Sequence, residues 1–116
     1  VAAEELRLMG VSDEICYAVR VHNPLLGLPR RSLMDKALYA ADPLSGLIVA
    51  CALVTRDKKL ANVDTDFVMM RFKETRFAAG AHRDQILACQ ELGLDLYAFA
   101  GIGLHSMKAV AEQIGL

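Results

Sequence analysis

Asp42 and His22 are the residues of the sequence that best fit a metal site, because carboxylate and imidazole groups both bind metal ions. Asp42 interrupts a largely apolar segment that extends from Ala37 to Ala50. An ionised carboxylate in apolar surroundings is costly unless a cation or several hydrogen-bond donors meet it. A bound metal ion would offset that cost, and the imidazole of His22 would provide a second ligand. The sequence therefore predicts a metal site that contains His22 and Asp42.

Both residues also have structural interpretations. His22 falls at the C-terminal end of an expected helix, where histidine often serves as a helix-terminal or satisfied polar residue. Asp42 precedes Pro43, and an aspartate before proline at the first helical position is a good N-cap arrangement. Asp35 lies two turns before Asp42 on roughly the same helix face, but its place in the first turn of a helix already gives it a structural role. Spacing alone leaves the role of Asp42 open.

The elements that must position these residues are expected to be helices. Hydrophobic residues make up 54% of the 116 residues and aromatic residues only 6%, and the abundant Ala, Leu and Met residues are strong helix formers. Capping residues and glycine stops place the helices at residues 1–9, 12–22, 32–54, 64–73, 82–92 and 95–113, the third of them bent at Pro43. The sequence predicts one all-α domain that spans residues 1–116.

Composition excludes several classes of function. The net charge of −1 gives no electrostatic footprint for nucleic acid or an anionic membrane. The longest apolar run, Gly46–Val54, is shorter than the roughly 20 residues of a membrane-spanning helix, and no signal peptide is visible. The cysteines are widely spaced, which predicts reduced, buried thiols in a cytoplasmic protein.

Other tempting features have plainer interpretations. Gly101 and Gly103 in a helix predict a close helix crossing rather than a nucleotide loop. His82 and His105 are expected to be structural. One basic cluster is interleaved with Phe72 and Phe77 and is expected to be a solvated face over buried phenylalanines; its members are Arg71, Lys73, Arg76 and Arg83.

The segment Leu33–Ala50 resembles the HD-domain metal-dependent phosphohydrolases, and it is closest to a prokaryotic subgroup usually described only as HD-domain hydrolases. Later segments look like the C-terminal part of the same subgroup: Lys58-Lys59-Leu60, Phe72-Lys73, Phe77–Gly80 and Glu91–Leu94. The resemblance covers essentially the whole chain. It implies an HD-like bundle of about five to six helices that lacks its N-terminal helices.

The resemblance also implies a ligand set. The family binds divalent metal with a histidine, a His-Asp doublet, sometimes further histidines, and a closing aspartate. Asp42 matches the closing aspartate, and His22, which follows Ala18–Val21, matches the late histidine. The first histidine and the doublet have no match in the sequence and are expected upstream of Val1.

The implied reaction is hydrolysis of a phosphate ester, such as a small phosphorylated metabolite or a nucleotide, with this chain supplying part of the metal site. The cofactor would be a divalent ion (Mn, Fe, Ni, Zn or Mg), which activates water and offsets phosphoryl charge. Arg30, Arg31 and Lys36 are candidate phosphate-binding residues, although a solvated surface would also explain them.

A non-enzymatic function is the alternative. The chain would then be a helical interaction or dimerisation module in which Asp42 only caps and His22 only packs, or a sensor that keeps a ligand pocket without turnover. A cytoplasmic protein without nucleic-acid or membrane partners is expected in each case. The sequence leaves open the substrate, the identity of the metal, the oligomeric state and whether this chain is active alone.

Overall fold

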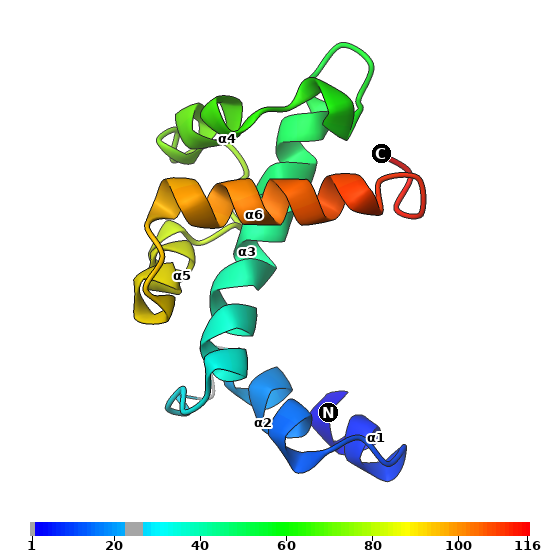
Figure 1. Cartoon of the computed structure of the whole chain (residues 1–116), viewed down its shortest axis with the longest axis vertical. Coiled ribbons are helices and arrows are strands. Elements are labelled where there is room, and N and C mark those ends of the chain that lie inside the picture. The colour runs from blue at the N-terminus through cyan, green and yellow to red at the C-terminus, as the bar shows by residue number, and fades with distance from the viewer. Residues whose placement is uncertain (1, 23–26) are drawn as a thin grey trace.

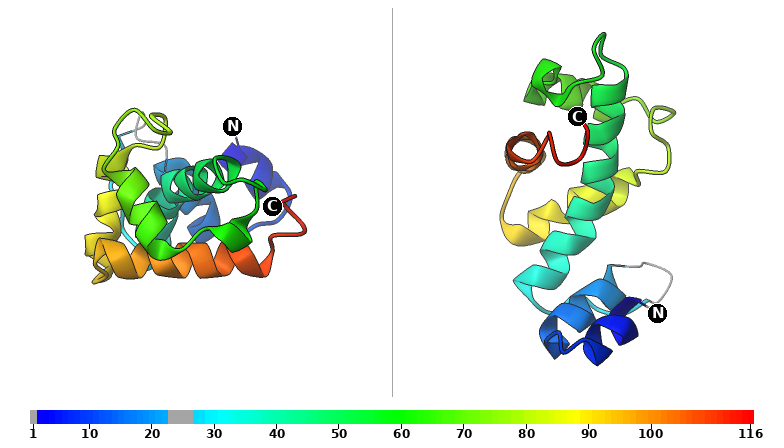
Figure 2. Two further views of the ribbon diagram at one scale, coloured as in Figure 1. Left: turned by 90° about the horizontal axis from the view of Figure 1, so that it is seen from above. Right: turned by 90° about the vertical axis from the view of Figure 1, so that its right-hand side faces the viewer.

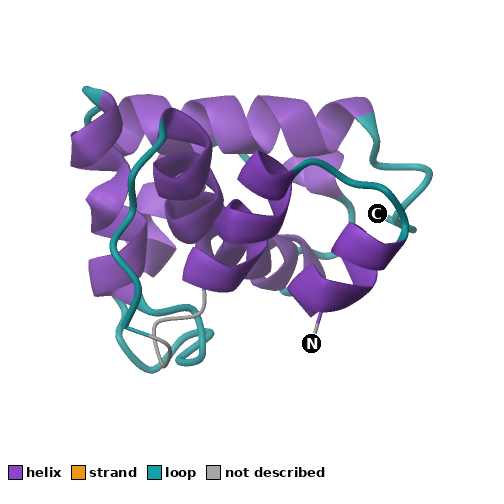
Figure 3. Ribbon diagram, turned by 90° about the horizontal axis from the view of Figure 1, so that it is seen from below, coloured by secondary structure: helices purple, strands orange, loops and turns teal. Residues whose placement is uncertain are grey.

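A computed structural model of the chain describes residues 2–22 and 27–116, and over these residues the protein is helical without strands. The predicted all-α fold is confirmed, as Figure 3 shows. The α-helices are α1 (Ala2–Leu8), α2 (Asp13–Val21), α3 (Leu33–Leu53), α4 (Thr65–Phe72), α5 (Arg83–Leu87) and α6 (Leu96–Ala109). The described segments also contain the 3-10 helices η2 (Leu60–Asn62) and η3 (Ala88–Leu92).

The long helix α3 is the axis of the molecule, which measures 43 × 28 × 24 Å (Figure 1). The helices α1 and α2 lie at its N-terminal end, and α2 packs against it. Helices α4, α5 and α6 contact α3, and α6 crosses over its C-terminal half (Figures 1 and 2). Helix α5 lies beside the middle of α3.

Helix ends follow the expected capping chemistry. The side chains of four N-cap residues each accept a hydrogen bond from a backbone N–H in the first turn, and these residues are Ser12, Ser32, Asp64 and Asp95. Gly10 and Gly93 end helices in the left-handed conformation, at φ of 85° and 77°. Two boundaries differ from the expectation, because the segment 82–92 divides into α5 and η3 and the last helix ends at Ala109.

Pro43 lies inside α3, and the helix continues through it. The N-cap interpretation of Asp42 is therefore wrong, because no helix starts at this point. Proline lacks the N–H that would otherwise bond the carbonyl four residues earlier, at Tyr39. The Gln85 side chain replaces that donor, with its Nε2 2.7 Å from the Tyr39 carbonyl oxygen. Gln85 is buried, and its place on α5 ties that helix to α3.

The core lies between α3 and the elements from η2 to α6 that surround it, with the largest fully buried side chains at Leu47 and Ile48. A Cβ atom at Gly103 would lie 2.7 Å from Leu44 Cδ2, so the expected close crossing is confirmed at this glycine. A Cβ at Gly101 would make only ordinary contacts with Thr65.

The three cysteines are free and buried, as expected. Burial raises the pKa of the Cys51 thiol to about 11 and also raises the pKa of Cys89. Both thiols therefore remain protonated and serve as small apolar side chains.

Among the described residues, α3 is the one helix whose length and composition would allow it to cross a membrane, and the bent pair of segments Arg83–Leu92 and Leu96–Ala109 would together pass the same test. A core helix of a globular protein meets these criteria equally well. The buried residues of α3 pack against the C-terminal helices.

Candidate functional site

Asp42 is exposed on α3. The expectation that its carboxylate lies in apolar surroundings is therefore wrong. Its apolar neighbours in sequence point elsewhere: position 42 lies roughly 200° around the helix from Leu44, which faces the core. The cost of a buried charge does not arise at Asp42, and any case for a ligand role must come from its position and accessibility.

Asp42 lines an open pocket of about 310 Å³ between α3 and a loop that precedes α5. From α3 come Pro43 and Gly46, and from the loop come Ala78, Gly80 and Ala81. Asp42 is the one ionisable residue of this lining. Asp42 is therefore accessible to solvent and borders the pocket.

His22 is the C-cap residue of α2, as expected, and is half-buried. Its ring nitrogen Nδ1 lies within hydrogen-bonding distance of the Val19 carbonyl oxygen. Because a carbonyl oxygen only accepts, Nδ1 carries the proton in this contact. In the neutral ring the lone pair then resides on Nε2. Histidines that bind metal through one ring nitrogen commonly donate the other N–H to such an acceptor.

His22 ends α2 and Asp42 lies on α3, and these two helices pack against each other. Val19, one turn before His22, and Ala41, directly before Asp42, line the same groove. Within residues 2–22 and 27–116, however, no three His, Cys, Asp or Glu residues gather closely enough to hold a metal ion. The described part of the chain thus offers an incomplete ligand set, and the metal site stays a prediction.

The buried carboxylate of α3 is Asp35, with only 1% of its surface exposed. Its Oδ2 accepts hydrogen bonds from the backbone N–H groups of Arg31 and Ser32 at 2.8 and 3.0 Å, and its own N–H donates to Ser32 Oγ at 3.1 Å. Burial opposes the charged form, but these hydrogen bonds outweigh it and lower the pKa of Asp35. The expected capping role is confirmed.

Of the candidate phosphate-binding residues, Arg30 is already engaged. Its Nε and Nη2 donate to the two carboxylate oxygens of Glu91, and its guanidinium stacks 4.1 Å from the centroid of the Tyr39 ring. Hydrogen bonding to this guanidinium lowers the pKa of Glu91 and raises that of Arg30. The pair ties the segment before α3 to η3.

Arg31 and Lys36 lie close to Arg30 in sequence, and their side chains are less engaged than that of Arg30. The guanidinium of Arg31 stacks 3.7 Å from the Tyr17 ring centroid, and its side chain is exposed. Lys36 is half-buried and lies near enough to Glu91 to help lower the pKa of that carboxyl. Neither Arg31 nor Lys36 forms an ion pair in the part of the chain that the structure describes.

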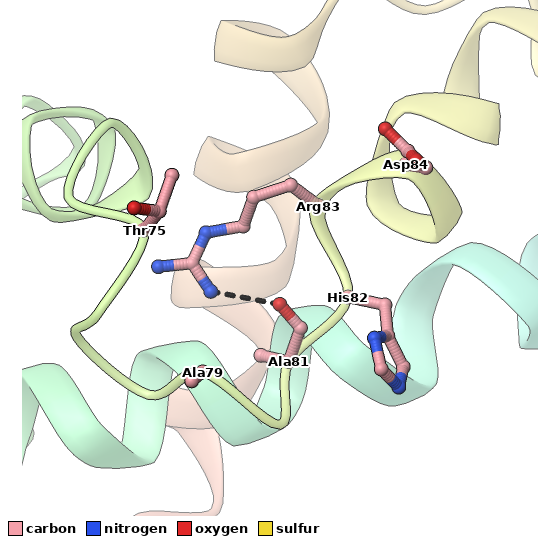
Figure 4. A pocket seen from close by; sticks show the side chains of 6 residues that line it. All are labelled: Thr75, Ala79, Ala81, His82, Arg83 and Asp84. Carbon is pink, nitrogen blue, oxygen red and sulfur yellow. Dashed lines mark hydrogen bonds between the residues drawn. The ribbon is translucent and has the colours of Figure 1, made fainter.

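Arg83 was expected on a solvated face, and this expectation is wrong. Its guanidinium donates to the backbone carbonyl oxygens of six residues, at 2.6 to 3.3 Å, which are Arg71, Phe72, Glu74, Phe77, Ala78 and Ala81. Figure 4 shows the guanidinium inside the bend of the chain, while the side chains of His82 and Asp84 point away from it. A small pocket of about 180 Å³ lies beside it.

The rest of the basic cluster is mixed. Arg71 is half-buried, stacks against Phe77 at 4.6 Å and pairs with Glu74 at 2.7 Å. Lys73 and Arg76 are exposed, as expected for a solvated face.

Sequence spacing gave no sign of the roles of Arg83 and Gln85. The one available signal was Pro43, which predicts a carbonyl at Tyr39 without its helical partner but not the residue that supplies a donor.

No protein-family model matches the chain, and no curated protein and no solved structure matches it. The assignment to the HD-domain family thus remains a prediction from the residues described above.

Proposed function

We propose that this chain is part of a metal-dependent phosphohydrolase of the HD type that acts on a phosphate ester, such as a small phosphorylated metabolite or a nucleotide. His22 and Asp42 would contribute two of its metal ligands. The remaining ligands would come from outside the residues described here. A cytoplasmic location is part of the same proposal.

The observation that supports this proposal best is the hydrogen bond between His22 Nδ1 and the Val19 carbonyl oxygen. It fixes the ring and leaves the Nε2 lone pair for a ligand, which is the arrangement that zinc- and iron-type sites use. The same contact also satisfies a carbonyl of the last turn of α2, as expected for a C-cap histidine. The exposed carboxylate of Asp42 beside an open pocket is compatible with the same role.

The chain would contribute recognition as well as ligands. A divalent ion (Mn, Fe, Ni, Zn or Mg) would supply Lewis acidity and lower the pKa of water toward neutrality. Arg31 and Lys36 are the candidates for phosphate contact, because neither is held in an ion pair within the described residues. Arg30 would support them indirectly through its pair with Glu91.

The test is hydrolysis by the full-length protein of p-nitrophenyl phosphate, bis(p-nitrophenyl) phosphate and nucleoside monophosphates, with each candidate ion and after chelation. We expect activity that requires metal and falls by about 100-fold or more in His22→Ala and Asp42→Asn. His105→Ala is the matched control, because His105 is exposed on α6 and outside the proposed site. Activity that survives chelation and both substitutions would contradict the proposal.

A specific observation also favours the alternative, a helical dimerisation module. An open groove between α2 and α3 is lined entirely by apolar residues, which are Ile15, Ala18, Val19, Met34, Ala37, Leu38 and Ala41. A second copy of the chain is the occupant that this alternative requires. Sedimentation velocity of the chain and of Ala37→Glu tests it: a dimer lost in the variant would support the module, and a monomer would exclude it. A sensor would instead bind metal without hydrolysis.

A further inference from the structure

The loop Phe77–Ala81 forms one wall of the pocket that contains Asp42. Ala78 in this loop adopts a left-handed conformation, at φ of 47°, which is unfavourable for a residue with a Cβ atom. The surrounding structure must therefore hold the loop in place.

Arg83 supplies that restraint. Its guanidinium bonds the carbonyl oxygens of Phe77, Ala78 and Ala81 at 2.6, 3.0 and 2.7 Å, and it also bonds carbonyls near the end of α4. An arginine side chain has five N–H donors. Nε makes one carbonyl contact, Nη1 makes two and Nη2 makes three, so all five donors are used and two carbonyls share one N–H of Nη2. Arg83 is therefore committed to the loop and has no donor left for a phosphate.

The opposite wall of the pocket contains Gly46, one turn after Asp42 on α3. Glycine inside a helix is unfavourable relative to alanine. Packing does not demand it here, because a Cβ atom at Gly46 would meet nothing within 4 Å. What this glycine does provide is open space beside the carboxylate.

We infer that the pocket between α3 and the Phe77–Ala81 loop receives the organic group of the phosphate ester, and that Arg83 is the positioning residue that fixes its loop wall. This inference rests on the proposed function. Gly46 then limits the size of the group that the pocket accepts, and Asp42, which lines the same pocket, would connect it to the proposed metal site.

Substitutions of Gly46 test the pocket directly. Position 46 is exposed and a Cβ atom there meets nothing within 4 Å, so Gly46→Ala is expected not to lower the melting temperature. The melting temperature of Gly46→Leu is measured beside it as the folding control. For a nucleoside monophosphate we expect KM to rise with side-chain size, by about tenfold or more in Gly46→Leu, with a smaller change in kcat. An unchanged KM in Gly46→Leu would overturn the pocket assignment.

Arg83→Lys tests the positioning role, with Arg56→Lys in the exposed turn after α3 as the matched control. Lysine has three donors on one nitrogen and does not reproduce the fork. We expect faster hydrogen exchange at the amide of Ala81, which is bonded to the Ala78 carbonyl, and a rise in KM that exceeds the fall in kcat. Equal exchange and equal KM in both variants would overturn the role of Arg83.

The failures are distinguishable. If the wild-type protein hydrolyses phosphate esters and Gly46→Leu does so equally well, the pocket is wrong and the proposed function stands. If the wild-type protein shows no metal-dependent hydrolysis, the proposed function fails and the pocket assignment fails with it. If Arg83→Lys does not fold, the Gly46 series still decides the pocket.

Discussion

The two halves of α3 have different surroundings. The C-terminal half is enclosed by α4, α5 and α6, and its inward side chains, such as Leu47, Ile48 and Cys51, are completely buried. The N-terminal half contacts α2 and, at Tyr39, the Gln85 side chain of α5, and an open apolar groove runs between α2 and α3. Nearby apolar side chains such as Leu8 and Leu33 are strongly exposed.

The two regions differ in the kind of residue they contain: one has most of the stabilising contacts, and the other has most of the candidate site residues. The C-terminal region has the close crossing, the buried thiols of Cys51 and Cys89 and the carbonyl contacts of Arg83, all of which stabilise the fold. The N-terminal region carries most of the candidate site residues, including His22, Arg31 and Lys36. Asp42 lies in the middle of α3 and lines a pocket whose other wall is the loop before α5.

The largest contrast is expected from matched leucine substitutions on α3. Leu47→Ala in the C-terminal region should lower the free energy of unfolding by about 2–5 kcal/mol, because it removes a fully buried side chain. Leu38→Ala, which lines the open groove, should cost about 1 kcal/mol, because less apolar surface is re-exposed. Urea denaturation measures both, and equal losses would contradict the distinction between the regions.

A double-mutant cycle tests the link between α5 and α3. Gln85→Leu leaves the Tyr39 carbonyl without its donor, which should cost about 1–3 kcal/mol. Pro43→Ala restores a backbone N–H for the same carbonyl. The cost of Gln85→Leu should therefore be smaller in the Pro43→Ala background, and strictly additive costs would show that the side chain does not replace the missing donor.

Asp35 gives a pH-dependent test of the N-terminal region. Because its pKa is lowered in the folded state, its carboxylate stabilises the protein above about pH 4 and loses this effect as the pH falls through the folded pKa. Asp35→Asn should cost about 1–3 kcal/mol at pH 7, and the difference from wild type should shrink in acid. Thermal unfolding across pH measures this, and a constant difference would contradict the assigned role.

The smallest expected effects come from two glycines of the crossing helices. Gly103→Ala places a Cβ atom 2.7 Å from Leu44 Cδ2 and should destabilise the protein by about 1 kcal/mol. Gly46→Ala meets nothing and should stabilise it by up to about 1 kcal/mol. Melting temperatures that move in the same direction would contradict the close approach assigned to Gly103.

Local chemistry was largely predictable from the sequence. The caps at Ser12 and Ser32 and the glycine stop at Gly93 depend on neighbours a few residues away, so type and spacing were sufficient. The close approach at Gly103 was also foreseeable, since a glycine inside a helix is unfavourable relative to alanine, although the same signal at Gly101 was not matched by a close contact. These signals fixed most of the helices.

The burial and tertiary contacts of individual side chains were less predictable from the sequence, as Asp42 shows. Its apolar neighbours in sequence suggested burial, but helical periodicity turns position 42 away from the face that carries Leu44 and Leu47. The buried carboxylate is Asp35, where α2 and the preceding segment cover the helix. Arg83 and Gln85 act on backbone groups brought close only by tertiary folding, and no local pattern marks such contacts.

The most direct test of the central claim is the divalent-metal content of the purified full-length protein, measured by mass spectrometry for wild type, His22→Ala, Asp42→Asn and His105→Ala. We predict stoichiometric metal in wild type and His105→Ala and a loss of about tenfold or more in the other two variants. Metal content unchanged by His22→Ala and Asp42→Asn would contradict the proposal that these residues are ligands.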